Sequence, residues 1–211
     1  MYRYKNFNFL KKLYILIVKQ KNHKKYGDII LYWDDFMKKV ALDLDGVVFN
    51  PENLYRVYAE IYDVEKNGKD TIIDNTQRIF QKRYNWTEEE FKEFYNENAE
   101  KVLTTANFMT GVDIVLNKLK DKFEFIVVTS RNDFETEIAR GKLKQIGFEN
   151  IKIFNNEHHK IERLIDENVS YMIDDDNGIC IHASDKVERD NAINVNNWGE
   201  IYKFLMLNEG E

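Results

Sequence analysis

The chain has 211 residues, of which 43% are hydrophobic and 32% charged, with a net charge of −6. This composition is typical of a folded globular protein and excludes a disordered or fibrous chain. Residues 1–36 carry eight Lys or Arg against three Asp, so the rest of the chain is more acidic than the total suggests. An acidic domain repels a phosphate backbone, which argues against a nucleic acid polymer as partner. The single cysteine, Cys180, cannot form an internal disulfide, and we expect a reducing, cytoplasmic location.

The first 36 residues combine basic flanks with the apolar run LYILIV. This run is far shorter than the roughly 20 residues that span a bilayer, and no small-residue cleavage site follows it. We therefore expect no stable membrane association, although a basic interfacial helix stays open. A second methionine, Met37, opens the strand-like segment MKKVALDLDG. We expect residues 1–36 to be an extension outside the fold.

From Met37 onward, apolar strand patterns alternate with helical patterns. The predicted strands are residues 40–45, 123–131, 151–154, 171–176 and 192–195, and the predicted helices between and after them are 134–148, 157–168 and 196–207. Strands that alternate with helices form βαβ units with right-handed crossovers. The sequence thus predicts an α/β fold with a Rossmann-like, doubly wound parallel sheet.

A long segment, residues 51–110, separates the first two predicted strands and has a helical pattern throughout. Pro51 suits the start of one helix, and Thr87 with Glu90 forms a capping-box pattern at the start of another. A crossover needs only one helix, so the additional helices predict an inserted cap. We expect the core to comprise residues 37–50 and 111–211, with the cap at 51–110 lying over the carboxyl ends of the strands as a lid.

Polar side chains follow the predicted strands at the edge where parallel strands end together. They are Asp43 and Asp45 after the first strand, Thr129, Ser130 and Arg131 after the second, Lys160 near a helix start, and Asp174, Asp175 and Asp176 after the fourth.

These residue types suit phosphoryl transfer. A carboxylate such as Asp43 can attack phosphorus and form an aspartyl-phosphate. Asp45 lies two residues further along the same strand face, where it can protonate the leaving alcohol and then take a proton from water. Gly46 permits a sharp turn that brings backbone N–H groups to the phosphate. Thr129 and Lys160 can hold its non-bridging oxygens.

The acidic run at 174–176, together with Asp43, offers hard oxygen ligands suited to Mg²⁺. Other metal sites fit less well. An EF-hand loop requires its glycine at the sixth position, whereas Gly46 is fourth from Asp43. No spacing among the candidate zinc ligands resembles a closed zinc site; these are His158, His159, Cys180 and His182.

The motif order resembles that of the haloacid-dehalogenase (HAD) superfamily of phosphohydrolases, with DLDGV, VVTSR, HHK and MIDDD as its four motifs. Residues 37 to about 205 are similar in particular to the 5′(3′)-deoxyribonucleotidase-like branch and its bacterial nucleotidases. The late VNNWGEIYKFL and the cap after the first motif carry this narrower resemblance.

The resemblance implies that Asp43 is the nucleophile and Asp45 the acid and base. It implies Mg²⁺ ligation by Asp43, by the main-chain carbonyl of Asp45 and by Asp175 with support from Asp174, with the register inside 174–176 left open. The substrate phosphate would contact Gly46, Thr129, Ser130, Arg131 and Lys160.

The leading hypothesis is therefore a Mg²⁺-dependent phosphomonoesterase that acts on nucleoside or deoxynucleoside monophosphates. Another small monoester such as a sugar phosphate, or a catalytically silent phosphate-binding protein, stays an alternative. A phosphoacceptor signalling module is disfavoured, because its acidic pair would come first in the chain and its phosphorylated Asp in the middle. The sequence leaves a homodimer open. The cap aromatics suit a packed core better than a base-binding site.

Overall fold

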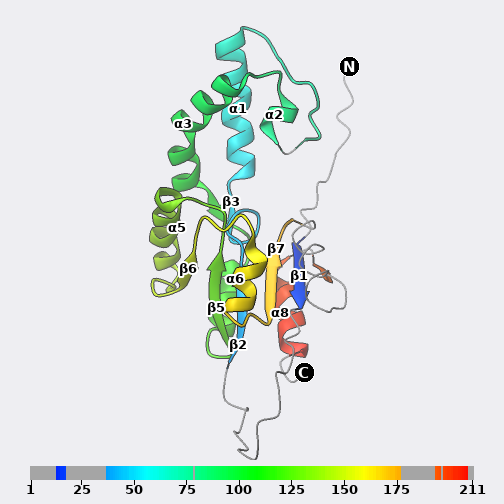
Figure 1. Ribbon diagram of the computed structural model, residues 1–211, viewed down its shortest axis with the longest axis vertical. Helices are drawn as coiled ribbons and strands as arrows, with labels where there is room; N and C mark the ends of the chain where they lie inside the picture. The colour runs from blue at the N-terminus through cyan, green and yellow to red at the C-terminus, as the bar shows by residue number, and fades with distance from the viewer. Residues whose placement is uncertain (1–12, 18–36, 78, 177–192, 196, 209–211) are drawn as a thin grey trace, which may run out of the picture.

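The computed structural model describes residues 13–17, 37–77, 79–176, 193–195 and 197–208. Within these residues, a six-stranded sheet of order β6-β5-β2-β7-β1-β8 forms the centre of one lobe. A second lobe of helices extends beyond one end of the strands (Figure 1). The sheet therefore presents one edge of strand ends to the helical lobe.

Four neighbouring strands are parallel: β2 (Lys38–Leu42), β5 (Phe123–Val128), β6 (Lys152–Phe154) and β7 (Tyr171–Asp174). β2 pairs with β5 on one side and with β7 on the other, and β5 pairs with β6. If these four strands are numbered 1 to 4 along the chain, their order across the sheet is 3-2-1-4, which is the Rossmann-like arrangement. The predicted α/β fold with a parallel sheet is confirmed.

Helices cover both faces of this sheet. Successive residues of a strand point to opposite faces, so neighbouring residues pack against different helices. Val40 and Leu42 pack with α4 (Val112–Leu119), α5 (Asp133–Gln145) and α8 (Trp198–Leu207). Ala41, between them, packs in a separate cluster with α6 (Lys160–Asp166). The sheet is thus buried on both faces, as the continuous apolar run of β5 predicts.

Two further strands extend the sheet beyond β7. β1 (Leu13–Ile17) pairs antiparallel with β7 and with β8 (Ile193–Val195). Five residues of the segment expected to lie outside the fold therefore form a strand within it, and the rest of residues 1–36 lies outside the described residues. An apolar, β-branched run can satisfy its backbone groups by pairing with an open sheet edge, which is the physical reason for the difference.

The helical lobe consists of α1 (Glu52–Asn67), α2 (Phe80–Arg83) and α3 (Glu88–Thr105). It joins the core through β3 (Phe49–Asn50) and β4 (Asn107–Phe108), which pair antiparallel. Its own buried hydrophobic cluster consists of Ala59 and the aromatic residues Tyr62, Tyr84, Trp86 and Phe94. None of the described helices combines the length and apolar character needed to cross a bilayer.

The prediction of helix throughout residues 51–110 is wrong between α1 and α3. α1 ends at Asn67 and is capped by Gly68, whose φ of +66° lies in the left-handed region. α2 has only four residues. The capping box of Thr87 and Glu90 at the start of α3 is confirmed.

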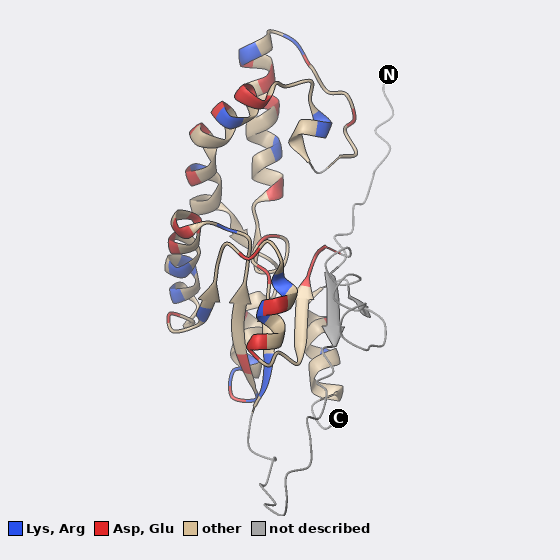
Figure 2. Cartoon of the chain, viewed as in Figure 1, with Lys and Arg blue, Asp and Glu red and all other residues tan. Residues whose placement is uncertain are grey.

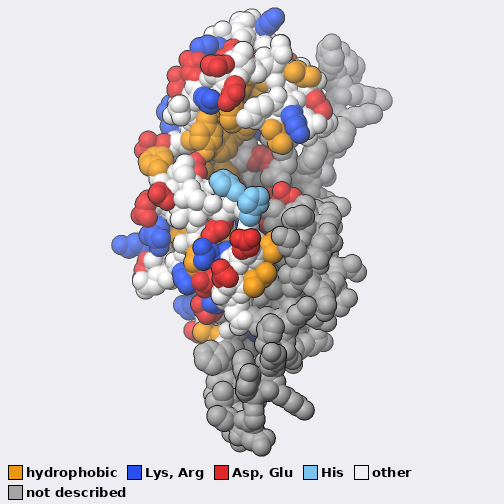
Figure 3. All heavy atoms as spheres, in the orientation of Figure 1, with side chains coloured by type: hydrophobic (Ala, Val, Ile, Leu, Met, Phe, Trp, Pro, Cys, Tyr) orange, Lys and Arg blue, Asp and Glu red, His pale blue; other side chains and the backbone are white. Residues whose placement is uncertain are grey.

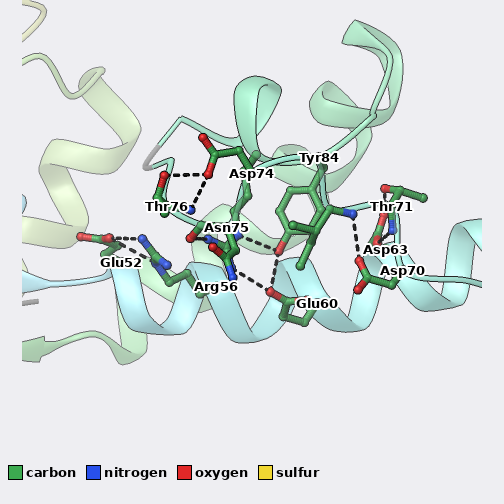
Figure 4. A network of polar contacts seen from close by, with 12 residues as sticks. Glu52, Arg56, Glu60, Asp63, Asp70, Thr71, Asp74, Asn75, Thr76 and Tyr84 are labelled. Atoms are coloured by element: carbon green, nitrogen blue, oxygen red, sulfur yellow. Dashed lines mark hydrogen bonds and ion pairs between the residues drawn. The ribbon is translucent and has the colours of Figure 1, made fainter. Parts of the chain in front are cut away.

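Side chains of α1 hold the loop that replaces the expected helix (Figure 4). Asp63 accepts hydrogen bonds from the backbone N–H of Thr71 at 2.7 Å and from the indole N–H of Trp86 at 2.6 Å. One turn earlier, Glu60 accepts a hydrogen bond from the hydroxyl of Tyr84 at 2.9 Å. These polar contacts, of which the one between Asp63 and Trp86 is buried, hold the loop without helical hydrogen bonds.

Candidate active site

The predicted site residues meet at the carboxyl ends of β2, β5 and β7. Asp43 directly follows β2, and its N–H donates to the carbonyl of Ile173 in β7 at 3.0 Å. Thr129 directly follows β5, Asp174 ends β7, and Lys160 is the first residue of α6. Figure 2 shows an acidic segment at the carboxyl end of β7 and a basic segment at the start of α6.

Lys160 connects the two acidic strand ends. Its Nζ lies 2.9 Å from Oδ1 of Asp43 and 2.8 Å from Oδ2 of Asp174. All three side chains are buried. Burial alone would lower the pKa of Lys160, but the charges and hydrogen bonds of the two carboxylates raise it overall. Lys160 therefore stays an ammonium ion that can neutralise negative charge at this point.

The pKa of Asp43 is raised to about 6. Burial is the main cause, Lys160 opposes it, and the neighbouring charges of Asp174 and Asp45 raise the value further. More carboxylates than cations therefore meet in this buried position. Additional positive charge would favour the ionised form of Asp43, which is the form that can act as a nucleophile.

The same acids fit a divalent cation. Asp43, Asp174 and Asp175 each offer a carboxylate oxygen, and these oxygens lie within 4.8 Å of one another. Oδ2 of Asp174 already accepts from Lys160, and its Oδ1 accepts from the N–H of Asp176 at 2.8 Å. The donor set suits Mg²⁺. Asp43, Asp174 and Asp175 are therefore the described residues that could hold such an ion.

Gly46 allows the loop after β2 to approach Asp175. Its φ is +83°, and its N–H donates to the carbonyl of Phe49 at 2.8 Å. A Cβ atom added at Gly46 would lie 2.1 Å from Oδ2 of Asp175. The position therefore requires glycine both for its backbone conformation and for the space that the carboxylate occupies.

Asp45 and Arg131 form a bidentate ion pair. Nε of Arg131 lies 3.0 Å from Oδ2 of Asp45, and Nη2 lies 2.6 Å from Oδ1. From the sequence, Arg131 is expected to contact the substrate phosphate, whereas in the structure its guanidinium binds Asp45, the expected acid and base.

The other members of the second motif differ in exposure. Thr129 is buried; its hydroxyl accepts the N–H of Arg131 at 3.3 Å, and its own N–H donates to the carbonyl of Phe154 at 2.9 Å. Ser130 is exposed. The site therefore presents Thr129 as part of a loop that is tied back to the sheet.

Helix α8 contacts the loop of the first motif. The indole N–H of the buried Trp198 donates to the carbonyl of Val47 at 2.9 Å. This contact joins a late part of the chain to the loop that carries Asp45 and Gly46. From the sequence, the segment around Trp198 is singled out only because it resembles the corresponding segment of bacterial nucleotidases.

Two residues near the site were missed by sequence reasoning. Glu135 forms a capping box with Asn132 at the start of α5, and its side chain also accepts a hydrogen bond from the hydroxyl of Tyr95 in α3. The pattern N-x-x-E directly after VVTSR could have revealed the cap. Nothing in the sequence links Tyr95 to it.

The zinc candidates do not converge within the part of the chain that the structure describes. His158 and His159 are exposed, and Cys180 and His182 lie outside the described residues. Figure 3 shows the two histidines on the core lobe, below apolar side chains that gather on the helical lobe.

No protein-family model matches the chain. The chain is 27% identical over 148 residues to the Halalkalibacterium halodurans protein named "Putative nucleotidase BH1399", covering 68% of this chain and 73% of that protein. It is 22% identical over 190 residues to the Bacillus subtilis protein named "Putative nucleotidase YqfW", covering 82% of this chain and 96% of that protein. A solved hydrolase from Streptococcus pneumoniae TIGR4 shares the fold, with a TM-score of 0.52, 16% identity, and coverage of 81% of this chain and 98% of that one.

The fold and the candidate site combine a Rossmann-like core with acidic residues at the carboxyl ends of its strands. The four motifs stand in order along this core, and the chain is similar in fold to that solved hydrolase and in sequence to two proteins named putative nucleotidases.

Proposed function

We propose that this protein is a Mg²⁺-dependent phosphomonoesterase that works through an aspartyl-phosphate on Asp43. One observation supports the proposal most strongly: the buried carboxylate of Asp43 lies 2.9 Å from the ammonium of Lys160 and beside Asp174 and Asp175. A carboxylate that is held next to a cation and a metal-ligand set is arranged to receive an anionic phosphoryl group.

The first step forms one bond and breaks another. A carboxylate oxygen of Asp43 attacks phosphorus, the phosphorus–oxygen bond to the alcohol breaks, and Asp45 gives its proton to the departing oxygen. In the second step Asp45 takes a proton from water, whose oxygen attacks phosphorus. The Asp43–phosphorus bond then breaks, and inorganic phosphate leaves.

The remaining groups stabilise charge. Lys160 and the hydroxyl of Thr129 would bind the non-bridging oxygens. A Mg²⁺ ion held by Asp43 and Asp175 would offset the negative charge of phosphate and carboxylates. Ser130, being exposed, would contact phosphate from the open side.

The substrate class follows from the relatives and the helical lobe. Both named relatives are called nucleotidases, so we infer that nucleoside or deoxynucleoside monophosphates are hydrolysed. The helical lobe, residues 51–110, would serve as the cap that covers the bound phosphate ester. A sugar phosphate is the alternative substrate. The cytoplasmic location, the homodimer and the absence of a nucleic acid partner stay predictions.

A phosphate-release screen tests this proposal. Nucleoside monophosphates and sugar phosphates are each incubated with Mg²⁺ and with a chelator. We expect release that requires Mg²⁺, is greatest with a nucleotide, and is lost in Asp43→Asn but not in the matched control Asp121→Asn, which lies in an exposed turn. Preference for a sugar phosphate would overturn the substrate class alone. No release from any monoester would favour the silent phosphate-binding alternative.

A further inference from the structure

The environment of Arg131 differs from that of an arginine poised for a ligand. The side chain of Arg131 is only 3% exposed, whereas that of its partner Asp45 is 43% exposed. Its Nε and Nη2 both donate to Asp45, and its Nη1 donates to the backbone carbonyl of Glu135 at 3.3 Å. Each of the three guanidinium nitrogens therefore already donates to an acceptor within the chain.

Neighbouring groups hold this guanidinium in place. Its central carbon lies 5.4 Å from the centre of the Phe49 ring, which is buried. The Glu135 carbonyl belongs to the first turn of α5, where the N–H of Glu135 donates to Oδ1 of Asn132 at 3.0 Å and Oε2 of Glu135 accepts from the N–H of Asn132 at 3.0 Å. The guanidinium of Arg131 is thus held in one orientation, in which its planar Nε and Nη2 groups donate to Asp45.

Asp45 needs such a support. It lies in the turn that follows β2, and its side chain is 43% exposed, so a carboxylate at this position can change rotamer unless a contact such as the bidentate pair with Arg131 holds it. Proton transfer requires the carboxyl oxygen to lie at hydrogen-bonding distance from the departing oxygen, and small misplacements lower the rate strongly.

We propose that Arg131 is a positioning residue for Asp45, and not a direct contact of the substrate phosphate. The proposal rests on the proposed function, because it concerns the proton that Asp45 gives to the departing oxygen while the Asp43–phosphorus bond forms. Arg131 aligns the Asp45 carboxyl group for this transfer. It does so through the bidentate contact, which a lysine cannot reproduce.

The leaving group separates the two roles. An aryl phosphate with a strongly acidic phenol departs as an anion and needs little protonation, whereas an alkyl phosphate needs a proton from Asp45. The ratio kcat/KM reports the steps up to departure of the alcohol. We expect Arg131→Met and Arg131→Lys to lower kcat/KM about 10- to 100-fold for the alkyl substrate. For the aryl phosphate we expect a change of about twofold or less, because little proton transfer is needed.

A double-mutant cycle with Asp45→Asn adds a second criterion. If Arg131 acts through Asp45, Arg131→Met in the Asp45→Asn background changes kcat/KM for the alkyl phosphate by about twofold or less. If Arg131 binds phosphate directly, the two losses multiply. Arg140→Met, at a partly exposed position of helix α5, is the matched control and should match the unaltered protein.

Binding of inorganic phosphate gives a readout that is independent of turnover. Titration calorimetry in the presence of Mg²⁺ should give the same dissociation constant for Arg131→Lys and the unaltered protein within about threefold, whereas loss of a direct charged contact would weaken binding about tenfold or more. Three results would each overturn the role of Arg131. They are equal losses of kcat/KM with the alkyl and the aryl phosphate, multiplicative losses of kcat/KM in the double-mutant cycle, and tenfold weaker binding of inorganic phosphate. Absence of any turnover by the unaltered protein would overturn the proposed function itself, and the positioning role with it.

Discussion

At the scale of single residues, the close approach of Gly46 to Asp175 sets the shape of the site. A side chain at Gly46 meets two separate obstacles: a left-handed backbone and the carboxylate of Asp175. Gly68, which ends α1, shares the first obstacle only, with φ of +66° and nothing within 4 Å of an added Cβ atom. The two glycines therefore separate backbone strain from steric collision.

We expect Gly46→Ala and Gly68→Ala each to lower the free energy of unfolding by about 1–2 kcal/mol through backbone strain. Only Gly46→Ala should also displace Asp175 and raise the Mg²⁺ concentration needed for half-maximal phosphate release. Thermal unfolding and Mg²⁺ titrations measure the two effects. Equal Mg²⁺ requirements in the two variants would show that Asp175 is not held by this contact.

Sequence reasoning named the residues of the site but not all of their partners. Asp43, Lys160 and Asp174 could be predicted to meet because each stands at a strand or helix end of a parallel sheet. The partner of Arg131 could not, because a motif fixes where a side chain starts and not the direction in which a long side chain extends. The hydrogen bonds of Asp174 to Lys160 and to the backbone of Asp176 are likewise tertiary features.

At the scale of elements, Asp63 ties helix α1 to the loop before α2. Burial alone would raise the pKa of Asp63, but hydrogen bonds from Thr71, Trp86 and Asn67 lower it overall, below its ordinary value of 3.8. A carboxyl group with a lowered pKa in the folded state stabilises that state above its ordinary pKa. The stabilisation is lost as the pH falls through the lower, folded-state value.

We expect Asp63→Asn to lower the free energy of unfolding by about 1–3 kcal/mol near neutral pH, because buried donors lose a charged acceptor. The difference from the unaltered protein should shrink as the pH falls from 3.8 toward the lower folded-state pKa of Asp63, below which both proteins carry a neutral side chain. Urea unfolding at several pH values measures this. A difference that stays constant down to the lowest pH at which the protein folds would contradict the role of the ionised carboxylate.

The sequence predicted the strands of the parallel sheet and the long helices, because each has a clear apolar period. It missed α4, an eight-residue helix whose N-cap is Gly111 and which therefore has no side-chain cap to announce it. It also extended helix through residues 68–77, where hydrogen bonds to Asp63 and Glu60 hold a loop. Both errors arise where tertiary contacts, and not local propensity, decide the backbone.

At the scale of the whole molecule, the helical lobe is joined to the core by the β3–β4 pair and by α3 against α5. The hydroxyl of Tyr95 in α3 donates to the carboxylate of Glu135 in α5, and the Tyr95 ring stacks on that of Tyr55 in α1, with ring centres 6.1 Å apart. Glu135 also supplies the carbonyl that holds Arg131. The lobe and Asp45 are therefore connected through a short series of contacts.

We expect Tyr95→Phe to loosen the lobe without unfolding the core. Backbone amides of α1 and α3 should exchange with deuterium several-fold faster, at roughly the level that loss of one hydrogen bond permits, while those of β2, β5 and β7 stay protected. The matched control Tyr58→Phe removes a hydroxyl from α1 and leaves the Tyr95 contact in place. Faster exchange in the core strands, or none in the lobe, would contradict this connection.

The whole account depends on transfer of a phosphoryl group to the side chain of Asp43. The most direct measurement is to mix the protein with an aryl phosphate and Mg²⁺, quench with acid within the first turnover, and locate the phosphoryl group by peptide mass spectrometry. We predict a hydroxylamine-sensitive phosphoryl group on the peptide that contains Asp43, and none in Asp43→Asn. A phosphoryl group on another residue, or full phosphate release by Asp43→Asn, would contradict the account.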